Sequence, residues 1–236
     1  MIIKELIKPF LKYLDFLLNT NFYPRLISQS SKIFYKNDYK ISGYDLVFIH
    51  IMKTAGTSFH QLLKEIEKTG VKIKHNVHFG ISIAEKPNKP VYCTIIRNPI
   101  DRSISLYNHY CRDKKSPYHT LALKGFSTFM RFCPEAQNNF CKNYSGELDK
   151  DVDENIYRLA FNNLKEFKHI LFFDKIDEEF EIIKKIYKIS SKDKYHYRSF
   201  EKKGYDDKIK RNIATFYNYY DIKLYESINE FFKKKV

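Results

Sequence analysis

The sequence contains few of the residues that interrupt regular structure and none of the usual cysteine patterns. Seven glycines and seven prolines among 236 residues argue against long low-complexity segments. The four cysteines form no C-x-x-C pair and have no zinc-site spacing, so we expect free thiols in a reducing compartment and no metal. With 43% apolar residues, the composition predicts a chain that buries a sizeable core.

The sequence also lacks an apolar run long enough to cross a membrane. Residues 1–22 are apolar but interrupted by five charges: Lys4, Glu5, Lys8, Lys12 and Asp15. A membrane span needs ~20 largely uncharged residues. No small-residue cleavage site follows, as it would in a signal peptide. We expect an N-terminal helical extension, residues 1–43, packed on a main domain, residues 44–236. A cytoplasmic location is expected, with peripheral membrane contact through this helix as the alternative.

Acidic residues are scarce relative to basic ones, 28 against 42, which gives a formal net charge of +14. A basic surface favours anionic partners such as nucleotides, nucleic acids, membranes and acidic glycans. No recognised nucleic-acid-binding motif accompanies the charge. A nucleic-acid-binding module is therefore the weakest interpretation, and no nucleic-acid partner is expected.

Short apolar runs alternate with amphipathic helical patterns along the chain. The runs are residues 45–51, 91–96 and 169–173. Continuous apolar runs of this length are typical of buried parallel strands, and intervening helices favour an α/β fold. We therefore predict a P-loop-like parallel sheet flanked by helices, ending in one helix over about 206–234. Residues 112–150 and 190–205 have the least regular pattern.

The segment FIHIMKTAGTSF, residues 48–59, joins the first strand to the first helix. Such a unit places backbone N–H groups and a helix N-terminus at the carboxyl edge of a sheet. Gly56 allows close approach of an anion and Lys53 adds charge. The hydroxyl donors are Thr54, Thr57 and Ser58. The loop predicts an oxyanion cradle, although its lysine precedes its glycine, unlike the nucleotide loop G-x-x-x-x-G-K-[ST].

A second anion site is predicted in RNPIDRSISLYNHY, residues 97–110. Arg97 ends a strand and can bind a phosphate bidentately. Ser105 lies eight residues later in the following helix and can reach the same anion, and Arg102 shares its helical face. Two anion sites at one sheet edge fit a nucleoside with phosphates at opposite ends. A P-loop kinase, the alternative, would leave Arg97 and Ser105 without a role.

The two segments together resemble the donor-binding motifs of sulfotransferases. Residues 48–59 are similar to the 5′-phosphosulfate loop, and residues 97–110 to the 3′-phosphate motif R-[DN]-P-x-x-R-x-x-S-x-Y. The resemblance is closest to glycan sulfotransferases related to heparan sulfate 2-O-sulfotransferase and their bacterial relatives, over about residues 45–232. This sequence departs from the family at four positions: Met52, Phe140, Cys141 and Lys142.

The resemblance implies 3′-phosphoadenosine 5′-phosphosulfate (PAPS) as donor, PAP as product, no metal, and in-line transfer to a hydroxyl. Arg97 and Ser105 would hold the 3′-phosphate. The 5′-phosphate would lie against the loop: Lys53, Thr54, Ala55, Gly56, Thr57 and Ser58. Lys53 would stabilise the departing phosphate during transfer.

The resemblance also implies a histidine base and a carbohydrate acceptor. The base would come from KHNVHFG, residues 74–80, as His75 or His78, with His75 favoured. The residues expected to bind the acceptor, a glycan or a lipid-linked sugar, are Asn138, Lys142 and Arg112. His50 is expected to brace the loop and His60 to face solvent.

Overall fold

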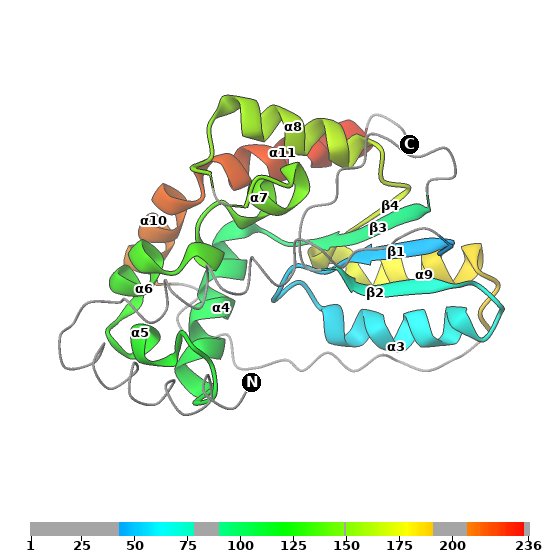
Figure 1. Cartoon of the computed structure of the whole chain (residues 1–236), viewed down its shortest axis with the longest axis horizontal. Helices are drawn as coiled ribbons and strands as arrows, with labels where there is room; N and C mark the ends of the chain where they lie inside the picture. Colours follow the sequence, from blue (N-terminus) through cyan, green and yellow to red (C-terminus); the bar gives the residue numbers. More distant parts are fainter. Residues whose placement is uncertain (1–42, 78–89, 149, 191–206, 234–236) are drawn as a thin grey trace.

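The computed structural model describes residues 43–77, 90–148, 150–190 and 207–233, which form an α/β fold (Figure 1). Four parallel strands in these ranges make one sheet, in the order β2-β1-β3-β4. The strands are β1 Leu46–Ile49, β2 Ile73–Val77, β3 Val91–Ile96 and β4 His169–Phe172. The predicted parallel sheet flanked by helices is confirmed.

The three predicted strands are present as β1, β3 and β4, and β2 is an additional one. β2 pairs with β1 alone and forms one edge of the sheet, with Leu46 opposite Ile73 and Ile49 opposite Val77. Its sequence, IKHNV, has no continuous apolar run. An edge strand can be held by backbone pairing while part of its surface stays polar, which is why a search for apolar runs misses it.

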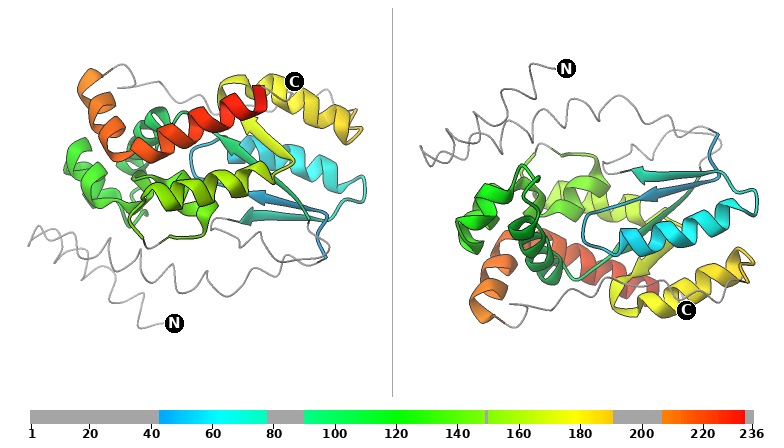
Figure 2. Two further views of the ribbon diagram at one scale, coloured as in Figure 1. Left: turned by 90° about the horizontal axis from the view of Figure 1, so that it is seen from above. Right: turned by 90° about the horizontal axis from the view of Figure 1, so that it is seen from below.

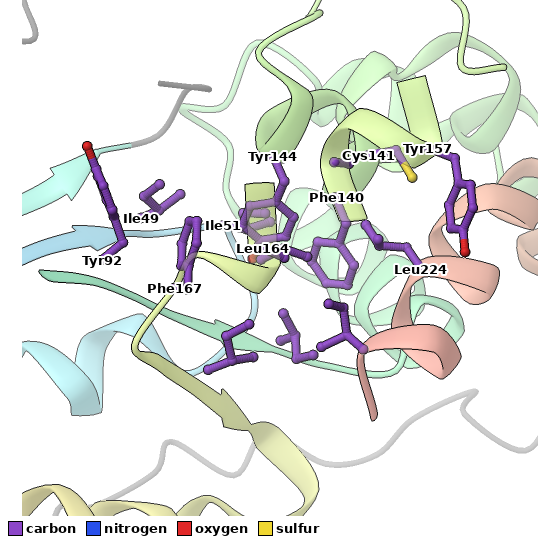
Figure 3. Packing of buried hydrophobic residues seen from close by; sticks show 14 of the residues in the cluster. Ile49, Ile51, Tyr92, Phe140, Cys141, Tyr144, Tyr157, Leu164, Phe167 and Leu224 are labelled. Carbon is purple, nitrogen blue, oxygen red and sulfur yellow. The ribbon is translucent and has the colours of Figure 1, made fainter. Parts of the chain in front are cut away.

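Helices cover both faces of the sheet (Figures 1 and 2). On one face lie α3 Gly56–Glu67 and α9 Ile176–Ile186, which pack on Leu46 and Phe48. On the other lie α7 Asn139–Ser145, α8 Glu154–Lys165 and α11 Tyr219–Lys233, which pack on Val47 and Ile49 (Figure 3). Alternate residues of β1 therefore enter two different cores, as the two-residue period of a strand requires.

The remaining helices form a third core beside the sheet. They are α4 Pro99–Arg112, α5 His119–Leu123, α6 Phe126–Phe132 and α10 Lys208–Tyr217. Buried side chains of all four meet there, including Ile104, Leu121, Phe129 and Ala214. The expectation that residues 112–150 are irregular is wrong, because this range holds α5, α6, α7 and a short 3-10 helix, Pro134–Ala136.

The single C-terminal helix predicted over 206–234 is two helices, α10 and α11, which meet at Asn218. Asn218 is fully buried and has φ −122° and ψ 28°. Its amide nitrogen donates to Ser103 Oγ at 3.1 Å, and its Oδ1 accepts from the Asn138 N–H at 3.2 Å. These bonds to α4 and to the turn before α7 explain the interruption, because a buried amide requires partners.

Some predictions concern residues outside the described ranges. The N-terminal extension falls there except for its last residue, as do His78 and most of 190–205. Within the described ranges, no helix is both long enough and apolar enough to cross a membrane.

Candidate anion-binding active site

The loop between β1 and α3 has an unusual backbone. Lys53 and Ala55 have φ values of 71° and 70°, in the left-handed region that residues other than glycine rarely adopt. Left-handed residues alternating with other conformations make the concave, anion-binding "nest" in which successive N–H groups converge. Residues 52–58, called here the Lys53 loop, therefore have a strained shape suited to an anion.

The N-terminus of α3 continues this anion-binding geometry. Ala55 occupies its N-cap position without a side-chain hydrogen bond, and its first turn contains no acidic residue. The first N–H groups of a helix have no intrahelical partner and carry partial positive charge. Each of the other described helices of eight or more residues has a side-chain cap or an acidic first turn. Within the described ranges, α3 is thus the long helix whose N-terminus suits an external anion.

Gly56 is required by a close contact with His50. A Cβ atom at Gly56 would lie 1.9 Å from His50 Nε2, so the imidazole occupies the space a side chain would need. The His50 ring stacks on Phe48, with centroids 5.4 Å apart. His50 therefore supports the Lys53 loop from the sheet side, as predicted.

The three predicted hydroxyl donors differ in the structure. Thr54 is fully buried and its hydroxyl donates to the Ile51 carbonyl at 2.7 Å, so this side chain closes the loop instead of offering a donor to a ligand. Thr57 is exposed, whereas Ser58 is buried. The Ser58 N–H donates to the Ala55 carbonyl at 3.1 Å. The backbone of residues 53–57 is consequently a better candidate for binding an anion than these hydroxyl groups are.

The structure brings the second predicted motif against the first. Arg97 follows β3, which lies next to β1 in the sheet. Its Nη1 donates to the Lys53 carbonyl at 3.1 Å, and its guanidinium lies 4.2 Å from the centre of the Phe173 ring. Ser105 is half-buried on α4, the helix that begins two residues after Arg97. Arg97 therefore lies against the Lys53 loop near the carboxyl edge of the sheet, which makes the two motifs candidates for one site.

The electrostatics of the site favour an anion. Burial lowers the pKa of Lys53, and the positive charges of Arg112 and Arg97 lower it further. The charges of both arginines therefore repel that of Lys53 in this partly buried region, and a bound polyanion would relieve the repulsion. Arg112, predicted as an acceptor-binding residue, ends α4 within electrostatic reach of Lys53.

His109 belongs to this region, although sequence reasoning assigned it no role. Burial lowers the pKa of its imidazole, as do the charges of Lys53 and Arg112, while Asp113 opposes the shift. The Asp113 Oδ2 lies 3.9 Å from His109 Nε2. His109 follows Ser105 by four residues and so shares its helical face, which is the signal that could have identified it. A neutral imidazole here can accept a hydrogen bond or a proton.

Of the two predicted bases, the described residues include His75. His75 lies in β2 with both ring nitrogens engaged: Nε2 is 2.8 Å from Glu67 Oε1, and Nδ1 is 3.1 Å from His60 Nδ1. Its ring stacks on that of His60, with centroids 5.3 Å apart. His60 is therefore half-buried against β2, and the expectation that it faces solvent is wrong. His78 lies outside the described residues.

The predicted acceptor residues belong to α7 and the turn before it. Asn138 Oδ1 accepts from the N–H groups of Tyr220 and Asp221, at 3.0 and 3.1 Å, and so caps α11. Asp221 caps α7 in return, because its carboxylate accepts from the N–H groups of Phe140 and Cys141, both at 2.8 Å. Asn138 thus has a capping role, while Lys142 is half-buried on α7.

The described residues contain no group of three His, Cys, Asp or Glu side chains placed to hold a metal ion. Residues 37–234 match a family model described as the sulfotransferase family. A comparison with curated proteins found no match.

Proposed function

The chain belongs to the sulfotransferase family, and from this membership we propose that it transfers a sulfuryl group from PAPS to a hydroxyl of a carbohydrate. The observation that supports PAPS most directly is the contact between Arg97 and the Lys53 carbonyl. It joins the cradle for one phosphate to an arginine suited to a second. A donor with both a 5′- and a 3′-phosphate fits two such phosphate-binding positions, whereas ATP has no 3′-phosphate.

The role of Lys53 follows from where charge develops. As the acceptor oxygen bonds to sulfur, the bond from sulfur to the 5′-phosphate oxygen breaks, and negative charge grows on that oxygen. Lys53 and the N–H groups of the nest would stabilise this charge without having to reorganise, because the loop already has its shape. Burial and the arginines lower the pKa of Lys53 in the free protein, and a bound polyanion would favour its charged form.

A histidine would take the acceptor proton, and His75 and His78 remain the proposed bases. The hydrogen bonds of His75 to Glu67 and His60 now favour His78, which directly follows Val77, the last residue of β2. Loss of a positioned base costs ~10²–10⁴ in rate. We expect one of His75→Ala and His78→Ala to show this loss in kcat with unchanged PAP affinity. If both retain wild-type kcat, the base lies elsewhere, and His109 is the next residue to replace.

The proposed acceptor is a sugar hydroxyl on an anionic or lipid-linked glycan. Arg112 and Lys142 are the proposed cationic contacts, while Asn138 would act by fixing the start of α7. The net charge of +14 would draw such an acceptor in. Cytoplasmic location, with membrane association through the N-terminal segment as the alternative, is part of this proposal.

Titration with PAP and with ATP, each with and without Mg²⁺, tests the donor. We expect selective binding of PAP that does not depend on Mg²⁺. Preferential, Mg²⁺-dependent binding of ATP would instead support the P-loop kinase alternative. Transfer from labelled PAPS to polysaccharides, lipid-linked sugars and tyrosyl peptides would then identify the acceptor class, and labelling of the peptides alone would contradict a carbohydrate acceptor.

A further inference from the structure

We propose that Arg102 is a positioning residue that orients the Lys53 loop and ties it to the turn leading into α7. This inference rests on the proposed function, in which the loop binds the donor and α7 lies on the acceptor side. Arg102 itself would touch neither substrate. Its effect would pass through two backbone carbonyl groups.

The guanidinium of Arg102 bridges two parts of the chain that are distant in sequence. Its Nε donates to the Met52 carbonyl at 3.2 Å, and its Nη2 donates to the Glu135 carbonyl at 2.9 Å. The group also lies 5.4 Å from the centre of the Phe140 ring, at the start of α7. The planar, rigid fork of an arginine fixes the directions of two such acceptors, which a lysine cannot do.

The position of Arg102 is costly, which argues against a role in packing alone. The side chain is 1% exposed, and its Nη1 has no hydrogen-bond partner among the described residues. Burial lowers the pKa of Arg102, and the nearby carboxylates of Asp221 and Glu135 only oppose that shift. An apolar side chain could fill the same space without this desolvation cost. Such a replacement would lose the two carbonyl contacts, as well as the positive charge near the carboxylates of Asp221 and Glu135.

The contact with Met52 determines where the next N–H group points. A trans peptide is planar, so the C=O of one residue and the N–H of the next point in opposite directions. Arg102 holds the Met52 carbonyl, and Arg97 holds the Lys53 carbonyl. The N–H groups of Lys53 and Thr54 must therefore point away from the two arginines. Two side chains of one motif thus orient consecutive donors of the nest.

The chain offers a matched control in Tyr110. The Glu135 carboxylate accepts a hydrogen bond from the Tyr110 hydroxyl, whereas its backbone carbonyl binds Arg102. Tyr110→Phe therefore removes this buried hydrogen bond, together with a weak contact of the same hydroxyl with Met52 Sδ at 3.6 Å. It leaves both backbone carbonyl bonds of Arg102 in place. A second control, Arg158→Lys, changes an exposed arginine on α8 that pairs with Glu154.

The experiment compares the wild type with Arg102→Lys, Tyr110→Phe and Arg158→Lys by PAP titration, transfer kinetics, thermal unfolding and amide hydrogen exchange. Arg102→Lys should weaken PAP binding about tenfold, as expected for loss of a charge-assisted bond. It should also lower kcat and speed exchange at the amides of Lys53 and Thr54. Tyr110→Phe should lower the thermal midpoint but leave PAP affinity and exchange at those amides unchanged. Arg158→Lys should match the wild type.

Two results would overturn the proposal. The first is that Arg102→Lys binds PAP with wild-type affinity and that its Lys53 and Thr54 amides exchange at the wild-type rate. The other is a loss of PAP affinity in both Arg102→Lys and Tyr110→Phe that follows the loss of thermal stability, since that pattern indicates a purely structural role. If the wild type itself fails to bind PAP, the proposed function fails, and hydrogen exchange still tests whether Arg102 orients the loop.

Discussion

The helices α3 and α4 begin at the same edge of the sheet, after neighbouring strands, yet their N-termini are built in opposite ways. α3 starts from a left-handed Ala55, without a side-chain cap or an acidic first turn. At α4, the Asn98 side chain accepts from the N–H groups of Ile100 and Asp101, at 3.0 and 3.3 Å. Pro99 occupies its first turn and removes one donor.

This difference separates two ways of binding a phosphate. The N-terminus of α3 has no side-chain cap and so lacks the stability that a cap adds to a helix, and in our proposal its first turn faces the anion instead. The N–H groups of Ile100 and Asp101 at the start of α4 bind Asn98 instead, so in our proposal this segment binds an anion through the side chains of Arg97 and Ser105. We call the Lys53 loop with the start of α3 the first arm, and Arg97 with Ser105 the second arm. The comparison predicts that backbone changes weaken phosphate binding by the first arm and that side-chain changes weaken phosphate binding by the second.

The largest effect on activity is expected from Lys53→Ala, which removes the charged side chain of the first arm. Loss of one preorganised donor to a developing oxyanion typically lowers kcat by ~10²–10³, and we expect at least this loss with the fold intact. Steady-state kinetics measure the loss of kcat, and circular dichroism tests whether the fold is intact. Lys68→Ala is the control, because Lys68 is exposed at the opposite end of α3. Equal activity of Lys53→Ala and the wild type would contradict the assignment.

Arg97→Ala should affect the second arm and raise the KM for PAPS. Loss of a charge-assisted contact of ~2 kcal/mol corresponds to about a thirtyfold change. kcat should fall less than in Lys53→Ala, because the 3′-phosphate is remote from the bond that breaks. The exposed Arg131 provides the control, as Arg131→Ala. An unchanged KM for PAPS would show that Arg97 only braces the Lys53 loop.

Gly56→Ala tests the backbone of the first arm without removing any charge. The new methyl group would meet the His50 imidazole, and overpacking of this kind costs ~1–3 kcal/mol. We expect about a tenfold loss of PAP affinity as the loop shifts. The double variant His50→Ala/Gly56→Ala should recover part of it, because the clash is removed. Calorimetric titration with PAP measures the affinity of both variants. If the double variant binds PAP more weakly than Gly56→Ala, the clash with His50 is not the cause of the loss.

The smallest effect is expected from Asn98→Ala, which removes the cap of α4. Loss of an N-cap costs ~1 kcal/mol, or about 2–4 °C in thermal midpoint for a domain of this size. PAP affinity should change far less than in Gly56→Ala. Differential scanning fluorimetry with and without PAP separates the two quantities. A loss of PAP affinity as large as that of Gly56→Ala would remove the contrast between the two helix ends.

The parts of the fold that the sequence predicted are those with local signals. β1, β3 and β4 are apolar runs because both faces of the sheet are covered. The helices of residues 119–145 had no such signal, since they are short and α7 is capped by Asp221 from far along the chain. The interruption at Asn218 also depends on tertiary partners, and the residues around it include neither glycine nor proline.

The same distinction holds in the candidate site. Lys53 and Arg97 could be expected at the sheet edge because Arg97 directly follows β3 and Lys53 lies four residues after the end of β1. The structure alone shows that Thr54 donates its hydroxyl to Ile51, that Asn138 caps α11, and that His109 lies within electrostatic reach of Lys53. Motif positions indicate which residues reach the sheet edge, but not which polar atoms already have a partner.

The exchange of caps between α7 and α11 has a consequence for how the protein is made. The partners are 80 and 81 residues apart, so the first amides of α7 obtain their carboxylate only after Asp221 has left the ribosome. β1, the Lys53 loop, β3 and α4 are all synthesised well before that point. The start of α7, on the proposed acceptor side, should therefore be the last part to assemble, and a nascent chain can form the Lys53 loop before it can complete α7.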